Sequence, residues 1–104
     1  MAEKYLYLVR MDVDDDKEAH FNDIYNNEHI PEISKVPGVG KITRAETATE
    51  GMPKYAAIYE MDRADLPSSP EWKAASDTGT WKDTVRPFTK NRSHAIYKIM
   101  EPGS

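Results

Sequence analysis

Two features of the sequence predict an α+β fold, with four strands in one antiparallel sheet and two helices on one face of that sheet. The first feature is order: segments of strand and helix character follow as strand, helix, strand, strand, helix, strand. The second is that the first strand segment is apolar on both of its faces. With 104 residues, 38% hydrophobic and 31% charged, the chain fits a single domain over residues 1–104.

The first strand and the first helix are predicted within residues 4–29. Residues 4–13 (KYLYLVRMDV) are dense in tyrosine, leucine and valine, which indicates a central strand covered on both sides. The acidic triplet at residues 14–16 supplies a helix N-cap and negative charge in the first turn. A calcium loop would need a glycine turn and a distal glutamate, which this segment lacks. We expect a helix over residues 17–29 that Pro31 stops, because the residue before a proline avoids the α conformation.

The middle of the chain predicts a hairpin. Residues 39–49 read as a polar strand near a sheet edge, and residues 54–61 (KYAAIYEM) read as a second core strand. The glycine and proline of residues 50–53 provide the turn between them.

A second helical region and a last strand complete the order. Ser69 before Pro70 is a helix start, because serine caps the N-terminus and proline suits the first helical position. Gly79 interrupts the helical pattern, so we expect two helical pieces joined by a kink. Residues 93–100 (SHAIYKIM) predict the final strand.

This order is that of the ferredoxin-like fold, which leaves one face of the sheet without helices. In the first strand the odd-numbered residues from Tyr5 to Met11 share one side, and Leu6 and Leu8 lie on the other. An uncovered face with such large apolar side chains would form an exposed patch. We therefore predict a homodimer in which two sheets pack face to face.

Composition excludes several classes of function. The net charge is −4 and no basic run occurs, which disfavours nucleic-acid binding. The chain has no cysteine, hence no disulfide, thiolate nucleophile or zinc–thiolate site. No signal peptide or membrane-spanning run is evident, so we expect a cytoplasmic protein without a membrane partner. Glycine-rich loops for phosphates are absent, so we expect no cofactor. Glu28, His29 and Glu32 could offer metal ligands, but the one obvious further donor, His94, comes from a distant strand, so we expect no metal.

The most informative motif is an aromatic and polar stripe that ends at a proline. Phe21, Tyr25 and His29 are successive i, i+4 neighbours on one helix face, which predicts a helix whose far end lines a pocket. An imidazole can serve as general acid or base near neutral pH, so His29 is the candidate catalytic group and Tyr25 its partner. The alternative is a structural histidine that caps the helix end and bonds to backbone carbonyls beside Pro31.

Further candidate substrate contacts surround this stripe. Glu28 projects near the apolar stripe, so it pairs with a cation such as Arg44, lines the cavity, or lies on the surface beside the proline bend. Aromatic side chains of helices and strands are more often core than substrate wall, but some can serve as both. The candidates for substrate binding are Phe21, Glu28, Arg44, Trp72, Trp81 and Tyr7.

The chain resembles the dimeric α/β-barrel superfamily, and within it the EthD-like proteins. The residues that match the family pattern are Phe21, Tyr25, His29, Pro31, Pro37 and Gly38. This resemblance implies a dimeric barrel fold over essentially the whole chain and a pocket at the recurrent histidine. It leaves the reaction open, because such relatives include cofactor-free monooxygenases, polyketide cyclases, dehydratases and muconolactone-type isomerases.

From these features we expect a cofactor-independent enzyme that acts by proton transfer, as an isomerase, dehydratase, cyclase or lyase. Its substrate would be a hydrophobic aromatic or polyketide-like carbonyl or phenolic compound, with His29 as base or acid and Tyr25 stabilising an oxyanion. Two alternatives remain open: a cofactor-free monooxygenase on a similar substrate, and a dimeric binding protein without catalysis.

Overall fold

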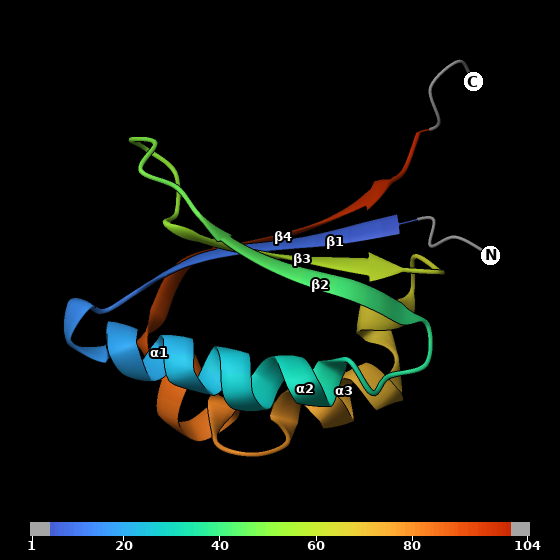
Figure 1. The fold of residues 1–104 in the computed structure, drawn as a ribbon, viewed down its shortest axis with the longest axis horizontal. Coiled ribbons are helices and arrows are strands. Elements are labelled where there is room, and N and C mark those ends of the chain that lie inside the picture. Colours follow the sequence, from blue (N-terminus) through green and yellow to red (C-terminus); the bar gives the residue numbers. More distant parts are fainter. Residues whose placement is uncertain (1–4, 101–104) are drawn as a thin grey trace.

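The computed structural model describes residues 5–100 and contains one four-stranded antiparallel sheet (Figure 1). The strand order is β2-β3-β1-β4, so β1 is central and β2 lies at an edge, as predicted. The strands are β1 (Tyr5–Val13), β2 (Val39–Glu46), β3 (Tyr55–Met61) and β4 (Thr89–Lys98). The predicted hairpin is present, because β2 and β3 are antiparallel neighbours.

All helical elements lie on one face of this sheet (Figure 1). The first helical run consists of a 3₁₀ turn η1 (Asp15–Lys17), α1 (Glu18–Ile24), a π-helical turn η2 (Tyr25–His29) and α2 (Ile30–Ile33). The second consists of η3 (Leu66–Ser68), α3 (Pro70–Asp77), a π-helical turn η4 (Trp81–Val85) and η5 (Arg86–Phe88). This is the α+β, ferredoxin-like arrangement that the sequence predicts.

The expectation that Pro31 stops the first helix is wrong. The helical run continues to Ile33, and the backbone N–H of Ile30 donates to the carbonyl of Tyr25, one residue further back than in an α-helix. This wider turn places Pro31 at the start of α2, where a missing N–H costs little. A π-helical turn of this kind is rare and occurs frequently at functional sites.

The second helical region behaves as predicted. The Oγ of Ser69 accepts a hydrogen bond from the backbone N–H of Trp72 at 3.2 Å, and Pro70 is the first residue of α3. Gly79 has a φ of +79° and separates α3 from η4, which gives the two pieces and the kink.

The last strand begins and ends earlier than predicted, at Thr89 and Lys98, and it contains a β-bulge near its start. β1 pairs with β4 through Asp12 opposite Lys90 and through Arg10 opposite Ser93. Two residues of β4, Asn91 and Arg92, therefore stand opposite the single residue Met11 of β1. The bulge breaks the simple alternation on which the prediction of residues 93–100 rested. β2 also ends earlier than expected, at Glu46. Lys4 and the residues after Met100 lie outside the described part of the chain.

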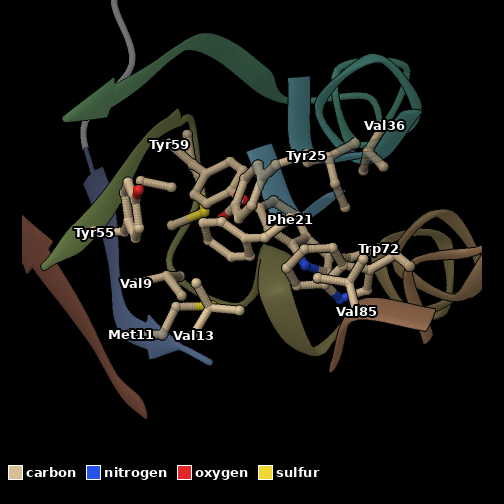
Figure 2. Close-up of a cluster of buried hydrophobic side chains, with 14 of the residues drawn as sticks. Val9, Met11, Val13, Phe21, Tyr25, Val36, Tyr55, Tyr59, Trp72 and Val85 are labelled. Carbon is tan, nitrogen blue, oxygen red and sulfur yellow. The ribbon is translucent and has the colours of Figure 1, made fainter. Parts of the chain in front are cut away.

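The core fills the space between the sheet and the helices (Figure 2). Val9, Met11 and Val13 of β1 face it, and Phe21 of α1 lies fully buried among the aromatic rings. On the opposite face of the sheet, partly exposed leucine and isoleucine side chains lie outside this core. Within residues 5–100, no helix has the length and apolar character needed to cross a membrane.

Candidate active site

A cavity of about 290 Å³ lies between the helix-facing side of the sheet and the helical layer. Val9 and Met11 of β1 belong to its lining. Its aromatic walls are Tyr7, Tyr25, Tyr59, Trp72 and Trp81. Its polar side chains are His29, Ser76, Arg86, Arg92 and His94. The cavity thus combines flat apolar walls with imidazole and guanidinium groups, and no carboxylate of residues 5–100 lines it.

His29 is held in this wall by aromatic rings rather than by hydrogen bonds. Its ring stacks on Trp81 with centroids 4.3 Å apart and planes 22° apart, and it meets the edge of Tyr25 at 5.2 Å. The side chain is 6% exposed, and its Nδ1 atom has no hydrogen-bond partner within residues 5–100. The arrangement differs from a helix-capping histidine bonded to backbone carbonyls, because the helix continues and Nδ1 stays unpaired.

Burial keeps the His29 imidazole uncharged. Desolvation, together with the nearby cation of Arg86, lowers the pKa of His29 to about 4, although Glu28 acts weakly in the opposite direction. At neutral pH the ring is therefore a neutral base, ready to accept a proton but only from an acidic donor.

Two phenols form a hydrogen-bonded pair in the wall. The hydroxyl oxygens of Tyr25 and Tyr59 are 2.8 Å apart, and both rings are buried. Burial raises the pKa of Tyr25 to about 12 and the pKa of Tyr59 well above its ordinary value. Burial also raises the pKa of Tyr7, whose ring lies 5.9 Å from that of Tyr59. These phenols stay protonated at neutral pH and can donate hydrogen bonds.

Arg44 supports the wall from outside the cavity. Its guanidinium lies over the ring of Tyr25 at 4.4 Å, and its Nη1 donates to the Oδ1 of Asn26 at 3.0 Å. Its Nε is buried and has no hydrogen-bond partner within the described chain. Arg44 therefore connects β2 to the π-helical turn η2 and does not line the cavity.

Glu28 also points away from the cavity. Its carboxylate accepts hydrogen bonds from the backbone N–H of Thr80 and from the Thr80 hydroxyl, the latter at 3.2 Å. Gly79 allows this close approach, because a Cβ atom there would lie 1.8 Å from a Glu28 carboxylate oxygen. The bond connects η2 to the segment that begins η4, which carries Trp81. Neither the expected pairing with Arg44 nor the expected cavity position is observed.

The structure brings five of the eight predicted site residues together around the cavity. These are Tyr7, Tyr25, His29, Trp72 and Trp81. Phe21, Glu28 and Arg44 do not line it. Phe21 is a core residue, with its ring 4.9 Å from that of Tyr55 and no exposed surface. The catalytic and binding roles of all eight stay predictions.

Sequence reasoning missed several side chains of the cavity. Arg86 follows η4, and Arg92 and His94 lie on β4. His94 stands opposite Val9 on the helix-facing side of the sheet, in a register that depends on the bulge of β4 and that residue spacing does not show. Within residues 5–100 no group of three or more acidic, histidine or cysteine side chains is placed to hold a metal ion.

Neither protein-family profiles nor curated protein sequences match the chain. Several solved structures share its fold, including the following three. SnoaB, a cofactor-independent oxygenase from Streptomyces nogalater, has a TM-score of 0.68 at 13% identity, covering 96% of both chains. An ethyl tert-butyl ether d (EthD) family protein from Bacillus halodurans has a TM-score of 0.60 at 18% identity, covering 92% of this chain and 99% of that one.

The third is a dimeric protein of unknown function and ferredoxin-like fold from Bacteroides fragilis, with a TM-score of 0.56 at 19% identity. The match covers 91% of this chain and 95% of that one. At these identities the likeness is one of fold. The chain shares the ferredoxin-like fold of these proteins, as its sequence predicted.

Proposed function

Starting from the fold it shares with these proteins, we propose that this chain is a cofactor-independent enzyme that removes a proton from a hydrophobic aromatic carbonyl or phenolic compound. The observation that carries the proposal is a buried, neutral imidazole, His29, in the aromatic wall of a cavity of about 290 Å³. A flat substrate that fills such a cavity excludes water and meets an uncharged base directly.

The first step moves one proton from substrate to His29. The substrate O–H or α-carbon C–H bond breaks, its electron pair stays on the substrate as a phenolate or enolate, and the imidazole becomes an imidazolium. A base with a pKa near 4 takes a proton only from an acidic donor, which favours a phenol or a doubly activated carbon acid. The cation of Arg86, which also lines the cavity, stabilises the resulting anion.

The protonated phenols can bind the developing oxyanion. Tyr25 and Tyr59 are 2.8 Å apart, so one hydroxyl donates to the other and the second keeps a free proton to donate. Return of the proton from His29 to another substrate atom gives an isomerisation. Departure of a leaving group from the enolate gives a lyase reaction, such as a dehydration.

A second candidate, cofactor-free oxygenation, is favoured by the shared fold with SnoaB, which is a cofactor-independent oxygenase. It uses the same first step. The carbanion formed at an activated CH₂ group adds O₂, and the hydroperoxide formed on protonation loses water to give a C=O group. Both hydrogens of the CH₂ group and one oxygen atom of O₂ leave as water, so no external reductant is required.

A bicyclic ketone with an acidic CH₂ group, 2-tetralone, tests both candidates. We expect the protein to accelerate exchange of its α-hydrogens in D₂O, and His29→Gln to reduce that rate by about 100- to 10,000-fold. The chain's own His20, an exposed histidine that does not line the cavity, provides the matched control His20→Gln. Oxygen uptake in parallel separates oxygenation from simple proton transfer. Binding without exchange or oxygen uptake would favour the dimeric binding protein and contradict catalysis.

We also infer that the chain forms a homodimer through the face of the sheet that carries no helix. On this open face Leu6 stands opposite Tyr97, and Leu8 opposite Ile58. Tyr97 is 50% exposed, and the known dimer among the structures of this fold supports the inference. Light scattering should give twice the monomer mass, and Leu8→Glu should give the monomer mass. A folded wild-type monomer at micromolar concentration would contradict the inference.

A further inference from the structure

The mouth of the cavity is positively charged in a chain whose net charge is −4. Arg86, Arg92 and His94 line it, and no aspartate or glutamate of the described part of the chain does. Arg92 and His94 are exposed, which places them where the cavity meets solvent. Two arginines at the rim of an aromatic cavity favour an anionic ligand.

The bulge of β4 directs the side chains of Arg92 and His94 toward the cavity. Lys90 stands opposite Asp12, so without a bulge His94 would stand opposite Leu8, on the open face. Because Asn91 and Arg92 together oppose Met11, His94 stands opposite Val9, on the helix-facing side. A one-residue shift in register therefore decides which face of the sheet carries Arg92 and His94.

The bulge is fixed by specific bonds. Asn91 has a φ of +55°, which asparagine tolerates better than most residues. Its Nδ2 donates to the Oδ2 of Asp12 at 2.8 Å, and the backbone N–H of Lys54 donates to the Oδ1 of Asp12 at 2.8 Å. The carboxylate of Asp12 thereby connects the bulge to the neighbouring strand segment.

The two arginines of the rim, Arg86 and Arg92, differ in whether they already form an ion pair. Arg86 forms an ion pair with Asp77 at 3.1 Å and donates to the Oγ of Ser76 at 3.3 Å. For Arg92, no ion pair with an acidic side chain is present within residues 5–100. Arg92 is therefore the guanidinium of the rim that is free to bind a ligand.

We propose that Arg92 binds the carboxylate of an aromatic acid whose rings occupy the cavity. This inference rests on the proposed function and names the class of its substrate. The planar fork of a guanidinium matches the two oxygens of a carboxylate. Next to it, the ring of His94 stacks on Tyr7 at 6.0 Å, and Tyr7 meets the edge of Trp72 at 5.5 Å, so aromatic surface continues inward from the charge.

Binding of 2-naphthoate, its methyl ester and 2-naphthol, measured by titration calorimetry at neutral pH, tests the proposal. The three probes share the ring system, and only naphthoate is charged. The wild-type protein should bind naphthoate about tenfold or more tightly than the ester. Arg92→Gln should remove that preference while ester binding changes less than about twofold, and Arg92→Lys should retain part of it.

The matched control is Arg63→Gln, which removes the same charge from an exposed arginine that pairs with Asp65 and does not line the cavity. It should leave naphthoate binding unchanged. The only two tryptophans of the chain line the cavity, so shifts of both indole N–H resonances on adding naphthoate show where it binds. Melting temperatures identify any variant that fails to fold.

Three results would overturn the proposal. Equal affinity of the wild-type protein for naphthoate and its ester is one, and an equal loss in Arg63→Gln and Arg92→Gln is another. Binding of 2-naphthol as tightly as naphthoate, and with the same dependence on Arg92, would show that a phenol rather than a carboxylate is recognised. Because these titrations need no turnover, an Arg92-dependent preference for naphthoate would support the inference even if 2-tetralone exchange failed.

Discussion

The two faces of the sheet come from the same strands but are covered in different ways (Figure 1). On the helix-facing side, β1 contributes Tyr7, Val9 and Met11 to a buried core and to the walls of a cavity. On the open face, the residues between them in sequence, such as Leu8, stay partly exposed and outside the core. Because successive side chains of β1 point to opposite faces, one face holds the candidate site and the other is left open for the proposed assembly.

Truncating one large aromatic side chain on each side of the sheet should give the largest difference in stability between the two faces. Phe21→Ala removes a fully buried ring from the helix-facing core and should lower the free energy of unfolding by about 3–5 kcal/mol at any protein concentration. Tyr97→Ala removes a half-exposed ring from the open face. Its effect should be small in dilute solution and grow with concentration, because this ring lies at the interface of the proposed dimer.

Urea unfolding of both variants at low and high protein concentration measures this difference. If the loss of unfolding free energy in Tyr97→Ala were independent of protein concentration, the open face would have no part in assembly.

The next largest expected effect is a pH dependence of the free energy of unfolding, which arises from His29 on the helix-facing side. The pKa of His29 is lowered to about 4 in the fold, whereas an unfolded histidine titrates near 6.5. Between these values the unfolded chain binds a proton that the fold excludes, so acidification favours unfolding. His29 should reduce the free energy of unfolding by about 3 kcal/mol as the pH falls from about 6.5 to about 4.

Urea titrations across this pH range provide the measurement, with His29→Gln as the comparison. The variant should lose less stability on acidification than the wild-type protein. The same loss in both proteins would mean that His29 is not the group that titrates.

The smallest expected effect concerns the phenol pair. Tyr25→Phe or Tyr59→Phe removes one hydroxyl from a buried hydrogen bond of 2.8 Å and leaves the ring in place. Each should cost about 1 kcal/mol, and the double variant should cost less than the sum of the two, because the bond is lost only once. Thermal unfolding of the three variants checks this. Strict additivity would show that the two hydroxyls do not interact.

The fold could be predicted because its determinants are local. Alternation in β1 and β3, the Ser69–Pro70 helix start and Gly79 each act over a few residues, and each has the predicted effect in the structure. The failure at Pro31 has a local cause that no pattern of apolar residues reveals, because an α turn and a π turn differ only by one residue in their hydrogen bonding.

The site was only partly predictable because it depends on contacts between distant segments. The stripe of Tyr25 and His29 was visible from helical spacing, and both side chains line the cavity. The direction of Glu28 depends on Thr80, 52 residues further along the chain. The position of Arg92 depends on a bulge that shifts the register of β4 against β1. Neither relation appears in the spacing of residues.

The neutral state of His29 in the aromatic wall is the central feature of the proposed site, and titration of this histidine by NMR tests it directly. The ring C–H resonances of the three histidines, assigned with single His→Gln variants, would be followed from acid to neutral pH. We expect His29 to titrate with a pKa of about 4, because burial and Arg86 oppose its charge. A pKa at or above the ordinary value near 6.5 would contradict the account, because the ring would then be charged or exposed to solvent.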